Sequence, residues 1–224
     1  TEVSLWITKC MNRRPNPALL LSGSFSIFII IGTGLLMLPR CTYSPISLVD
    51  SLFVATSAVC ITGLTPVDIS VTFTPLGELI LGLLIQIGGL GVLTFTSFFA
   101  LFYTGGTSIY SQMMVKDLIY TRSFNELFPT MLYILVVTLF SESIGAVIIY
   151  LSIQDVFPMT TQDEIWFAVF HSVSAFCNAG FSTVHGGMSN PMLLYGNQWV
   201  YLAMSLIVTA GSIGFPILVN YRDY

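Results

Sequence analysis

The chain has 224 residues with a formal net charge of −4, and 54 % of the residues are hydrophobic whereas 8 % are charged. A soluble domain carries roughly 25 % charged residues, so the composition indicates a membrane protein. The acidic balance offers no basic patch for nucleic acid. The four cysteines form no C-x-x-C pair, which argues against a disulfide framework and against a zinc site.

Four apolar runs are long enough to cross a bilayer as helices, since a spanning helix needs roughly 20 residues at about 1.5 Å per residue. They cover residues 17–38, 73–103, 128–151 and 195–219. Glu78 and Glu142 are the only acidic or basic residues within them, histidine included. The first run is too long for a signal-peptide core and no A-x-A-like site follows it, so we expect it to stay as a spanning helix.

The basic residues predict the orientation of these runs. With a cytoplasmic amino terminus, six of the seven Lys and Arg residues lie inside and Arg40 alone lies outside, as the positive-inside bias requires. We therefore expect a multi-pass protein of the cell inner (plasma) membrane with its amino terminus in the cytoplasm. Because the sequence opens on Thr1 and stops just past a hydrophobic run, we also expect it to be part of a longer chain.

A nine-residue stretch between the runs occurs twice. SAVCITGLT at 57–65 returns 117 positions later as SAFCNAGFS at 174–182, with the shared frame S-A-x-C-x-x-G-[LF]-[TS]. The following runs also match, with GGLG at 88–91 against GSIG at 211–214. A long internal repeat of this kind indicates two copies of one structural unit.

Two polar tetrads predict where a short helix starts before each copy. SLVD at 47–50 and TQDE at 161–164 read as capping boxes, in which Ser47 or Thr161 caps the first turn and Asp50 or Glu164 reaches back. A helix from Ser47 to Cys60 covers only about 20 Å and cannot cross. Since non-helical backbone at membrane depth requires protein or a water-filled cavity around it, we predict a re-entrant pore loop in each unit.

The expected fold is an all-α integral membrane protein with two tandem parallel membrane-pore-membrane repeats, made of four spanning helices and two re-entrant pore helices. Both units have the same even number of crossings, so they lie the same way up around an axis along the membrane normal. The predicted parts are a cytoplasmic segment at 1–16, the first repeat at 17–103, a cytoplasmic linker at 104–127 and the second repeat at 128–224.

The end of each pore helix is a natural site for a cation. A helix that enters from outside points its C-terminus, which carries partial negative charge, at the bilayer centre, and the next carbonyls can replace the hydration shell of an ion. The residues expected to contact the ion are Ile61, Thr62, Gly63, Leu64, Asn178, Ala179, Gly180 and Phe181. The predicted outer side is acidic, with Asp50, Asp68, Glu78, Asp155, Asp163 and Glu164 against Arg40, although each one alone fits a helix cap or a solvated loop charge.

Three motifs in this order and spacing resemble the Trk/Ktr/HKT superfamily of potassium uptake proteins, specifically membrane subunits of the TrkH/KtrB type. The motifs are TSAVCITGLT at 56–65, QIGGLG at 86–91 and HSVSAFCNAGFS at 171–182, and the resemblance runs from about residue 20 to 219. It implies potassium transport without catalysis, through a pore of four membrane-pore-membrane units that each supply one filter strand. It also implies a cytosolic nucleotide-binding regulatory ring as partner.

This chain departs from the family pattern because it holds only two units, which resemble the first and second of the four. A complete pore then needs the other half of a longer chain, which we favour, or a homodimer. The gating loop of the family belongs to the third unit. Glycine at the filter positions, here Gly63 and Gly180, goes with potassium in the family, whereas serine in the first unit goes with sodium.

Several residues admit a structural as well as a functional interpretation. Glu142 within a span is a candidate for ion contact, and supporting the filter by a hydrogen bond is the alternative that we favour. Together with Ser47, Asp50, Thr161 and Glu164 it forms the set expected to support the pore. Cys60, Cys177 and His171 suggest packing more than a metal or nucleophile site, Gly88, Gly89 and Gly91 suggest close helix packing, and Phe53 and Phe170 suggest core packing.

Other functions remain open at this point. Another monovalent cation such as sodium or ammonium is an alternative cargo, although ammonium pathways usually show paired histidines and only His171 is expected at membrane depth. An intramembrane enzyme requires a Ser/His, paired Asp or H-E-x-x-H set at that depth, and the sequence has none. A non-conducting scaffold gives no reason for capped half-helices that end in glycine loops. Beyond potassium as cargo, we expect neither a cofactor nor a metal.

Overall fold

The computed structural model describes residues 17–91, 127–154, 159–196 and 198–213. Within these ranges the regular structure is helical, apart from one antiparallel bridge between Thr42 and Phe73. The helices are α2 (Pro17–Leu36), α3 (Leu48–Val59), α4 (Ile69–Thr72), α5 (Pro75–Gly89), α8 (Leu127–Ile153), α9 (Thr161–Phe176), η2 (Gly187–Ser189), α10 (Pro191–Gly196) and α11 (Trp199–Ser212). The expected all-α class is confirmed for these residues, whereas the predicted segment 1–16 and nearly all of the linker 104–127 lie outside them.

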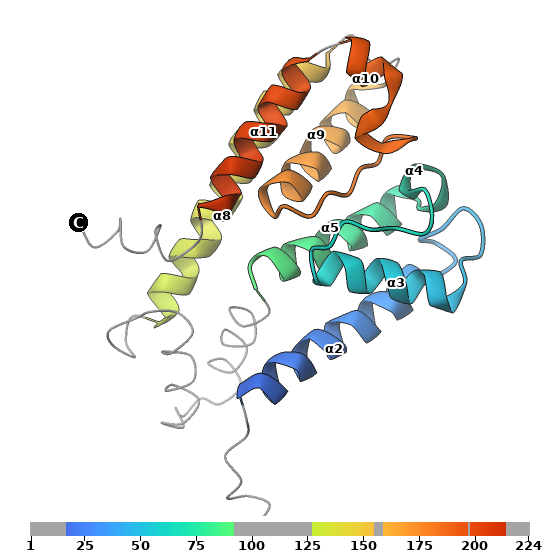
Figure 1. Ribbon diagram of the computed structural model, residues 1–224, viewed down its shortest axis with the longest axis vertical. Helices are drawn as coiled ribbons and strands as arrows, with labels where there is room; N and C mark the ends of the chain where they lie inside the picture. Colours follow the sequence, from blue (N-terminus) through green and yellow to red (C-terminus); the bar gives the residue numbers. More distant parts are fainter. Residues whose placement is uncertain (1–16, 92–126, 155–158, 197, 214–224) are drawn as a thin grey trace, which may run out of the picture.

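The first half of the chain folds as two long helices around a short one. Helices α2 and α5 both pack against α3 (Figure 1), and their shared core contains fully buried Leu36, Val54, Leu81 and Ile85. The buried hydroxyl of Ser51 donates to the carbonyl of Thr33 at 3.0 Å and so ties α3 to α2.

The second half repeats this arrangement with α8, α9 and α11 (Figure 1). Its core includes Ile149, Phe167, Ala203 and Ile207, and the Ser172 hydroxyl of α9 donates to a carbonyl of α8 at 2.7 Å. Each half thus has one helix, α3 or α9, that packs against two others. Helix α9 has 16 residues and α11 has 14, and the re-entrant character of α3 and α9 stays a prediction.

Both short helices start at a hydroxyl cap, and one of the two predicted caps is wrong by one residue. Ser47 caps α3 as predicted, because its Oγ accepts from the Asp50 N–H at 3.1 Å and donates to the Asp50 carboxylate at 2.7 Å. In α9 the cap is Thr160, whose hydroxyl makes the same pair of contacts with Asp163. Thr161 and Glu164 lie inside the first turn, because Thr160 has the extended backbone that a cap residue requires.

The return helices start later than the apolar runs do. Thr74 caps α5 and Pro75 follows it, where the missing N–H and fixed φ of proline suit the first turn. Helix α5 ends at Gly89 with Leu90 as its C-cap, and Gly91 beyond it has a φ of 77° in the left-handed region. Residues 92–103 of the predicted span lie outside the described ranges. In the second unit, Tyr195 belongs to the separate helix α10 and α11 starts at Trp199.

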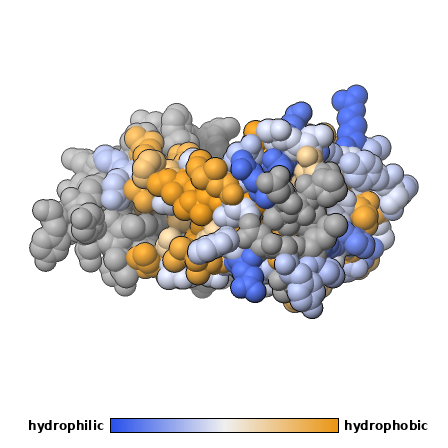
Figure 2. Space-filling view, turned by 90° about the horizontal axis from the view of Figure 1, so that it is seen from above, coloured by the Kyte–Doolittle hydropathy of each residue, from blue (hydrophilic) through white to orange (hydrophobic). Residues whose placement is uncertain are grey.

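The outer surface of the helices is strongly apolar. Large side chains such as Ile30 on α2, Phe140 on α8 and Leu206 on α11 are more than half exposed, and Figure 2 shows apolar residues gathered into a patch beside more polar surface. By length and composition, Leu132–Ile153 of α8 is the described helix segment that could cross a membrane, and the other apolar helices are shorter. Helix α3, with 12 residues, covers about 18 Å and is too short to do so.

Candidate functional site

The two repeated stretches end their helices with the same hydrogen-bonding pattern. After α3, the N–H groups of Ile61 and Thr62 donate to the carbonyls of Ala58 and Ser57. After α9, Asn178 and Ala179 donate to Ala175 and Ser174 in the same way. This is a Schellman termination, which needs a left-handed residue directly after the cap.

That left-handed position is filled by residues other than glycine. Ile61 has a φ of 56° and Asn178 a φ of 58°. Asparagine tolerates this region, whereas a β-branched side chain in it is an outlier that the surrounding structure must hold in place. Such strain clusters at functional sites, so the strained turn at Ile61 makes this loop a candidate for a functional site.

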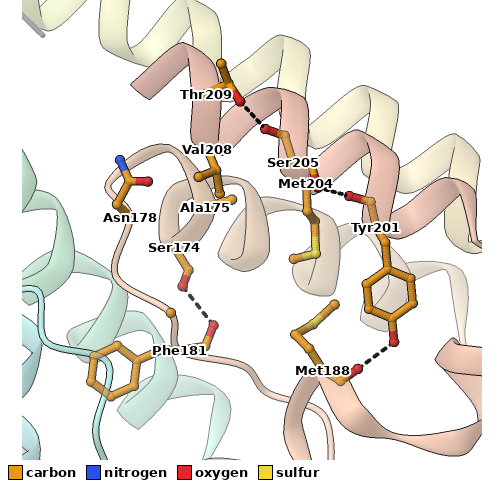
Figure 3. A pocket seen from close by; sticks show the side chains of 11 residues that line it. Ser174, Ala175, Asn178, Phe181, Met188, Tyr201, Met204, Ser205, Val208 and Thr209 are labelled. Atoms are coloured by element: carbon orange, nitrogen blue, oxygen red, sulfur yellow. Dashed lines mark hydrogen bonds between the residues drawn. The ribbon is translucent and has the colours of Figure 1, made fainter. Parts of the chain in front are cut away.

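Beyond the turn, a serine of each helix holds the returning strand. Ser57 Oγ accepts from the Leu64 N–H at 2.9 Å, and Ser174 Oγ donates to the Phe181 carbonyl at 2.8 Å (Figure 3). These two serines begin the repeated frame, yet we predicted no role for them. Their equal position in both copies was the signal in the sequence that could have revealed it.

The carbonyl groups of the turns have no partner within the described residues. No hydrogen bond from that part of the chain ends on the carbonyls of residues 61–63 or 178–180, whereas the carbonyls of Ser57, Ala58, Ser174 and Ala175 accept the bonds of the Schellman terminations. Ala179 is buried, whereas the other residues of the two turns are half-buried or exposed, and carbonyls without a protein partner bond to water or to an ion. The two loops therefore present acceptors that suit a cation.

The two loops lie against each other at their glycines. A Cβ added to Gly63 would stand 2.5 Å from the carbonyl oxygen of Ala179, and one added to Gly180 would stand 3.7 Å from the Gly63 Cα. Both glycines are also left-handed, with φ of 72° and 76°. Close approach and backbone conformation therefore both require glycine at position 63. Of the residues predicted to contact the ion, Gly63 of the first unit lies against Ala179 and Gly180 of the second.

A cavity of about 520 Å³ opens beside the second loop. Asn178, Gly180 and Phe181 line one side of it, and Tyr201, Ser205 and Thr209 of α11 line the other (Figure 3). Glu142 is not among its lining residues.

Helix α5 of the first unit packs along α9 of the second unit through a series of contacts. The Trp166 indole N–H donates to the Glu78 carboxylate at 2.6 Å, Gly82 faces the Phe170 ring, and Gly89 is in contact with Cys177. We predicted Glu78 to be a charge of the outer mouth, but it is buried in this contact. Phe170 packs in the core as predicted, whereas its counterpart Phe53 is 46 % exposed.

A second contact between the units lies in the loops that follow the turns. The Asp68 carboxylate is 2.8 Å from His185 Nδ1 and accepts from the Gly186 N–H at 3.4 Å. Partial burial alone raises the pKa of Asp68, but hydrogen bonds from Ser70 and Gly186, together with His185, hold it below the usual value. Asp68 therefore stays ionised at neutral pH and joins the two loops.

Glu142 lies behind the second turn and is 6 % exposed. Its carboxylate is 3.9 Å from the Cys177 thiol, which is equally far from the Gln86 side chain of α5. The residue thus stands where α5, α8 and the end of α9 meet. The contact of its carboxylate is with a side chain of α9's C-cap, and both the support of the filter and the direct contact to an ion stay predictions.

The other predicted support residues do not lie at the turns. Ser47 and Asp50 occupy the first turn of α3, about 18 Å of helix from its end, and Thr161 and Glu164 occupy the first turn of α9. Ser47 is the N-cap of α3, whereas for Thr161 the cap role is wrong because Thr160 caps α9. A role of these four residues in supporting the pore stays a prediction.

Cysteines and histidine form no metal centre in the described part of the chain, where no group of three potential ligands occurs. Cys177 is buried, as expected for packing, whereas Cys60 at the same frame position is exposed. Gly88 and Gly89 are close-packing positions as predicted, since Gly88 is in contact with the Val59 carbonyl. Gly91 instead follows the end of α5 in the left-handed conformation.

Comparison with known proteins agrees with this geometry. Residues 5–221 match the TrkH family, described as cation transport protein. The potassium/sodium uptake protein NtpJ of Enterococcus hirae is 34 % identical over 220 residues, which cover 96 % of this chain and 47 % of the relative. The Ktr system potassium uptake protein B of Bacillus subtilis is 34 % identical over 92 % of this chain and 45 % of the relative.

A further Ktr system potassium uptake protein B, from Vibrio alginolyticus, is 33 % identical over 87 % of this chain and 42 % of its own length. The chain thus spans about half the length of the curated relatives that it matches. The family match covers nearly the whole chain and includes both repeated stretches. This chain belongs to the TrkH family of cation transport proteins.

Proposed function

We propose that this chain forms half of a potassium-conducting pore, in which residues 61–64 and 178–181 supply two filter strands. The observation that carries the proposal is the pair of adjacent turns whose carbonyls have no hydrogen-bond partner among the described residues. Each turn stands at the C-terminal end of a half-helix, where the helix dipole adds partial negative charge. Rings of such carbonyls replace the hydration shell of potassium in channels.

Potassium is the preferred cargo for two reasons. Glycine occupies both filter positions, and the three relatives carry potassium uptake in their names. Sodium is the second candidate, because the name of the Enterococcus hirae protein includes it. No observation favours ammonium or a non-conducting scaffold.

The exposed faces of the two units suggest how the pore is completed. The α9 face covered by α5 includes Trp166, Phe170 and Cys177. The corresponding α3 positions in the repeat, Val49, Phe53 and Cys60, are exposed. Helix α3 therefore presents the face that α9 buries, and none of the described helices covers it as α5 covers α9.

The second unit has an unpaired face of the other kind, on its return helix α11. Residues Glu78, Gly82 and Gly89 of α5 correspond to Tyr201, Ser205 and Ser212 of α11, and Tyr201 and Ser205 line the cavity beside the second loop. We infer that this α11 face accepts a half-helix from a further membrane-pore-membrane unit, and that the α3 face accepts a return helix. Further units of one longer polypeptide are favoured by the coverage of about half of each relative, and a homodimer is the alternative.

The remaining features of the proposal concern topology and regulation. Two parallel repeats, at 17–103 and 128–224, span the cell inner (plasma) membrane with the segment 1–16 and the linker 104–127 in the cytoplasm. The charge asymmetry of the loops supports this orientation. A cytosolic nucleotide-binding ring as regulatory partner rests on the family resemblance.

The test is cation uptake by the complete protein in cells that lack their own potassium uptake. We expect growth at low external potassium and rubidium uptake that potassium inhibits more strongly than sodium or ammonium does. Equal inhibition by sodium would shift the assignment to the second candidate. Absence of uptake of any of the three ions, with normal amounts of protein in the membrane, would leave only the scaffold interpretation.

A further inference from the structure

The strand that leaves the second turn is held by a buried histidine that the first unit lacks. His171 of α9 is completely buried, and its Nε2 lies 2.9 Å from the hydroxyl of Ser182. Ser182 is the last residue of the repeated stretch and follows directly after the predicted filter residues. The contact thus spans from the middle of the half-helix to the outer end of the filter strand.

The hydrogen-bond partners determine the form of this imidazole. Its Nδ1 lies 2.8 Å from the Phe167 carbonyl, which is solely an acceptor, so Nδ1 carries the proton in the neutral ring. Nε2 then accepts from the Ser182 hydroxyl, while the Ser182 oxygen accepts from the Val184 N–H at 3.2 Å. A chain of hydrogen bonds therefore joins α9 to the strand.

Aromatic rings fix the orientation of the histidine. The Phe167 ring stacks on it with centroids 3.8 Å apart, and the Phe170 ring meets it edge-on at 5.7 Å. These contacts, together with the bond to Phe167, favour the orientation in which Nε2 faces Ser182. One helical turn further on, Ser174 holds the neighbouring residue Phe181, so two side chains of one helix face secure two consecutive residues of the strand.

The first unit is built differently at the same positions. Val54 stands where the second unit has His171, and Thr65 stands in place of Ser182. The Thr65 hydroxyl bonds within its own loop, to Val67. The first strand is held instead through Ser57, which receives the Leu64 N–H and the Thr62 hydroxyl.

We propose that His171 is a positioning residue for ion selectivity, which sets the Gly180 carbonyl by holding Ser182 at the outer end of the strand, and that this function belongs to the second unit alone. The inference rests on the proposed function in that the strand contacts the transported ion. It predicts that breaking the bond changes discrimination between ions of different size. A histidine that only fills the core would instead affect the amount of folded protein.

The experiment compares two replacements of the histidine in the complete protein. The amide of glutamine reaches approximately the place of Nε2, whereas that of asparagine reaches the place of Nδ1. His171→Asn thus keeps the contact with Phe167 and loses the contact with Ser182, and His171→Gln is expected to recover selectivity by retaining the contact with Ser182. Ser182→Ala removes the same bond from the other side, and Ser143→Ala is the control, since it removes an exposed hydroxyl of α8.

Rubidium, sodium and ammonium uptake are measured for each variant and normalised to protein in the membrane. We expect His171→Asn and Ser182→Ala each to lower the rubidium-to-sodium ratio roughly 3- to 10-fold, the range that a neutral hydrogen bond supplies. The double variant should lose no more than either single variant, because both remove one interaction. Additive losses, or an unchanged ratio in both single variants, would overturn the inference.

Failure of the proposed function is distinguishable from failure of this inference. The wild-type profile across the three ions identifies the preferred ion, and the variants are judged by the change in their ratios relative to that profile. If His171→Asn does not reach the membrane, Ser182→Ala decides the question, since Ser182 lies in a loop and is only partly buried.

Discussion

At the scale of single residues, the site depends on groups that hold the turns as much as on the turns themselves. Ser57 and Ser174 secure the returning strands, while Glu142 stands behind the second turn near the Cys177 thiol. The repeated frame predicted the glycines correctly, because left-handed positions are visible as glycines in a sequence. It could not predict the left-handed Ile61, since nothing local favours a β-branched residue there.

Glu142→Gln tests the supporting role of the carboxylate. We expect the variant to unfold more readily in detergent, by about 1 kcal/mol for a weakened buried hydrogen bond, while it keeps its preference for potassium over sodium. Thermal unfolding and uptake ratios measure the two effects separately. A changed ion preference with unchanged stability would favour direct ion contact, and no change in either would reject both interpretations.

At the scale of elements, the polar tetrads predicted where α3 and α9 begin but not which residue caps α9. In the second unit the two adjacent threonines, Thr160 and Thr161, are both possible cap residues in the sequence. Thr160 has the cap conformation and bonds to Asp163. Choosing between them required the backbone, because both threonines have an acidic residue three positions ahead.

Substitution of the caps tests this assignment. Ser47→Ala and Thr160→Ala should each destabilise the protein by roughly 0.5–2 kcal/mol, the usual contribution of an N-cap. Thr161→Ala, the matched control in the same turn, should have a much smaller effect. The midpoints of unfolding in detergent measure these differences in stability. A larger loss of stability for Thr161→Ala than for Thr160→Ala would reverse the cap assignment.

The packing of return helices on half-helices depends on glycine. Gly88 and Gly211 occupy matching positions and are in contact with the carbonyls of Val59 and Phe176. We expect Gly88→Ala to destabilise the protein by roughly 1–3 kcal/mol through overpacking. Gly34→Ala is the control, because nothing lies within 4 Å of its added Cβ and alanine is the better helix former. Equal stability of both variants in detergent would contradict the close packing.

At the scale of the whole molecule, the two units differ mainly in what covers them. The repeat predicted their likeness, yet it could not predict that Phe53 and Cys60 are exposed while Phe170 and Cys177 are buried. Identical frames in a sequence carry no information on neighbours. The contacts between units, such as Trp166 with Glu78 and Asp68 with His185, were also missed, since they join residues about 90 and 120 positions apart and no local pattern relates them.

The native cysteines offer a test of assembly. With Cys10 and Cys41 replaced by serine, Cys60 of this 224-residue chain should react readily with a maleimide while Cys177 stays protected. In the complete protein, a return helix from another unit should cover Cys60 and slow its labelling at least tenfold. Equal labelling of Cys60 in both proteins would show that its face stays open and would contradict the proposed completion of the pore.

The most direct test of the central claim is the ratio of rubidium to sodium uptake by the complete protein with Gly63→Ser. The side chain adds an atom 2.5 Å from the Ala179 carbonyl and disfavours the left-handed backbone, so the two filter strands must shift apart. We expect sodium to compete more strongly and the ratio to fall by about tenfold, equivalent to roughly 1.4 kcal/mol. Unchanged rubidium and sodium uptake at normal protein levels would contradict the assignment of these loops as the filter.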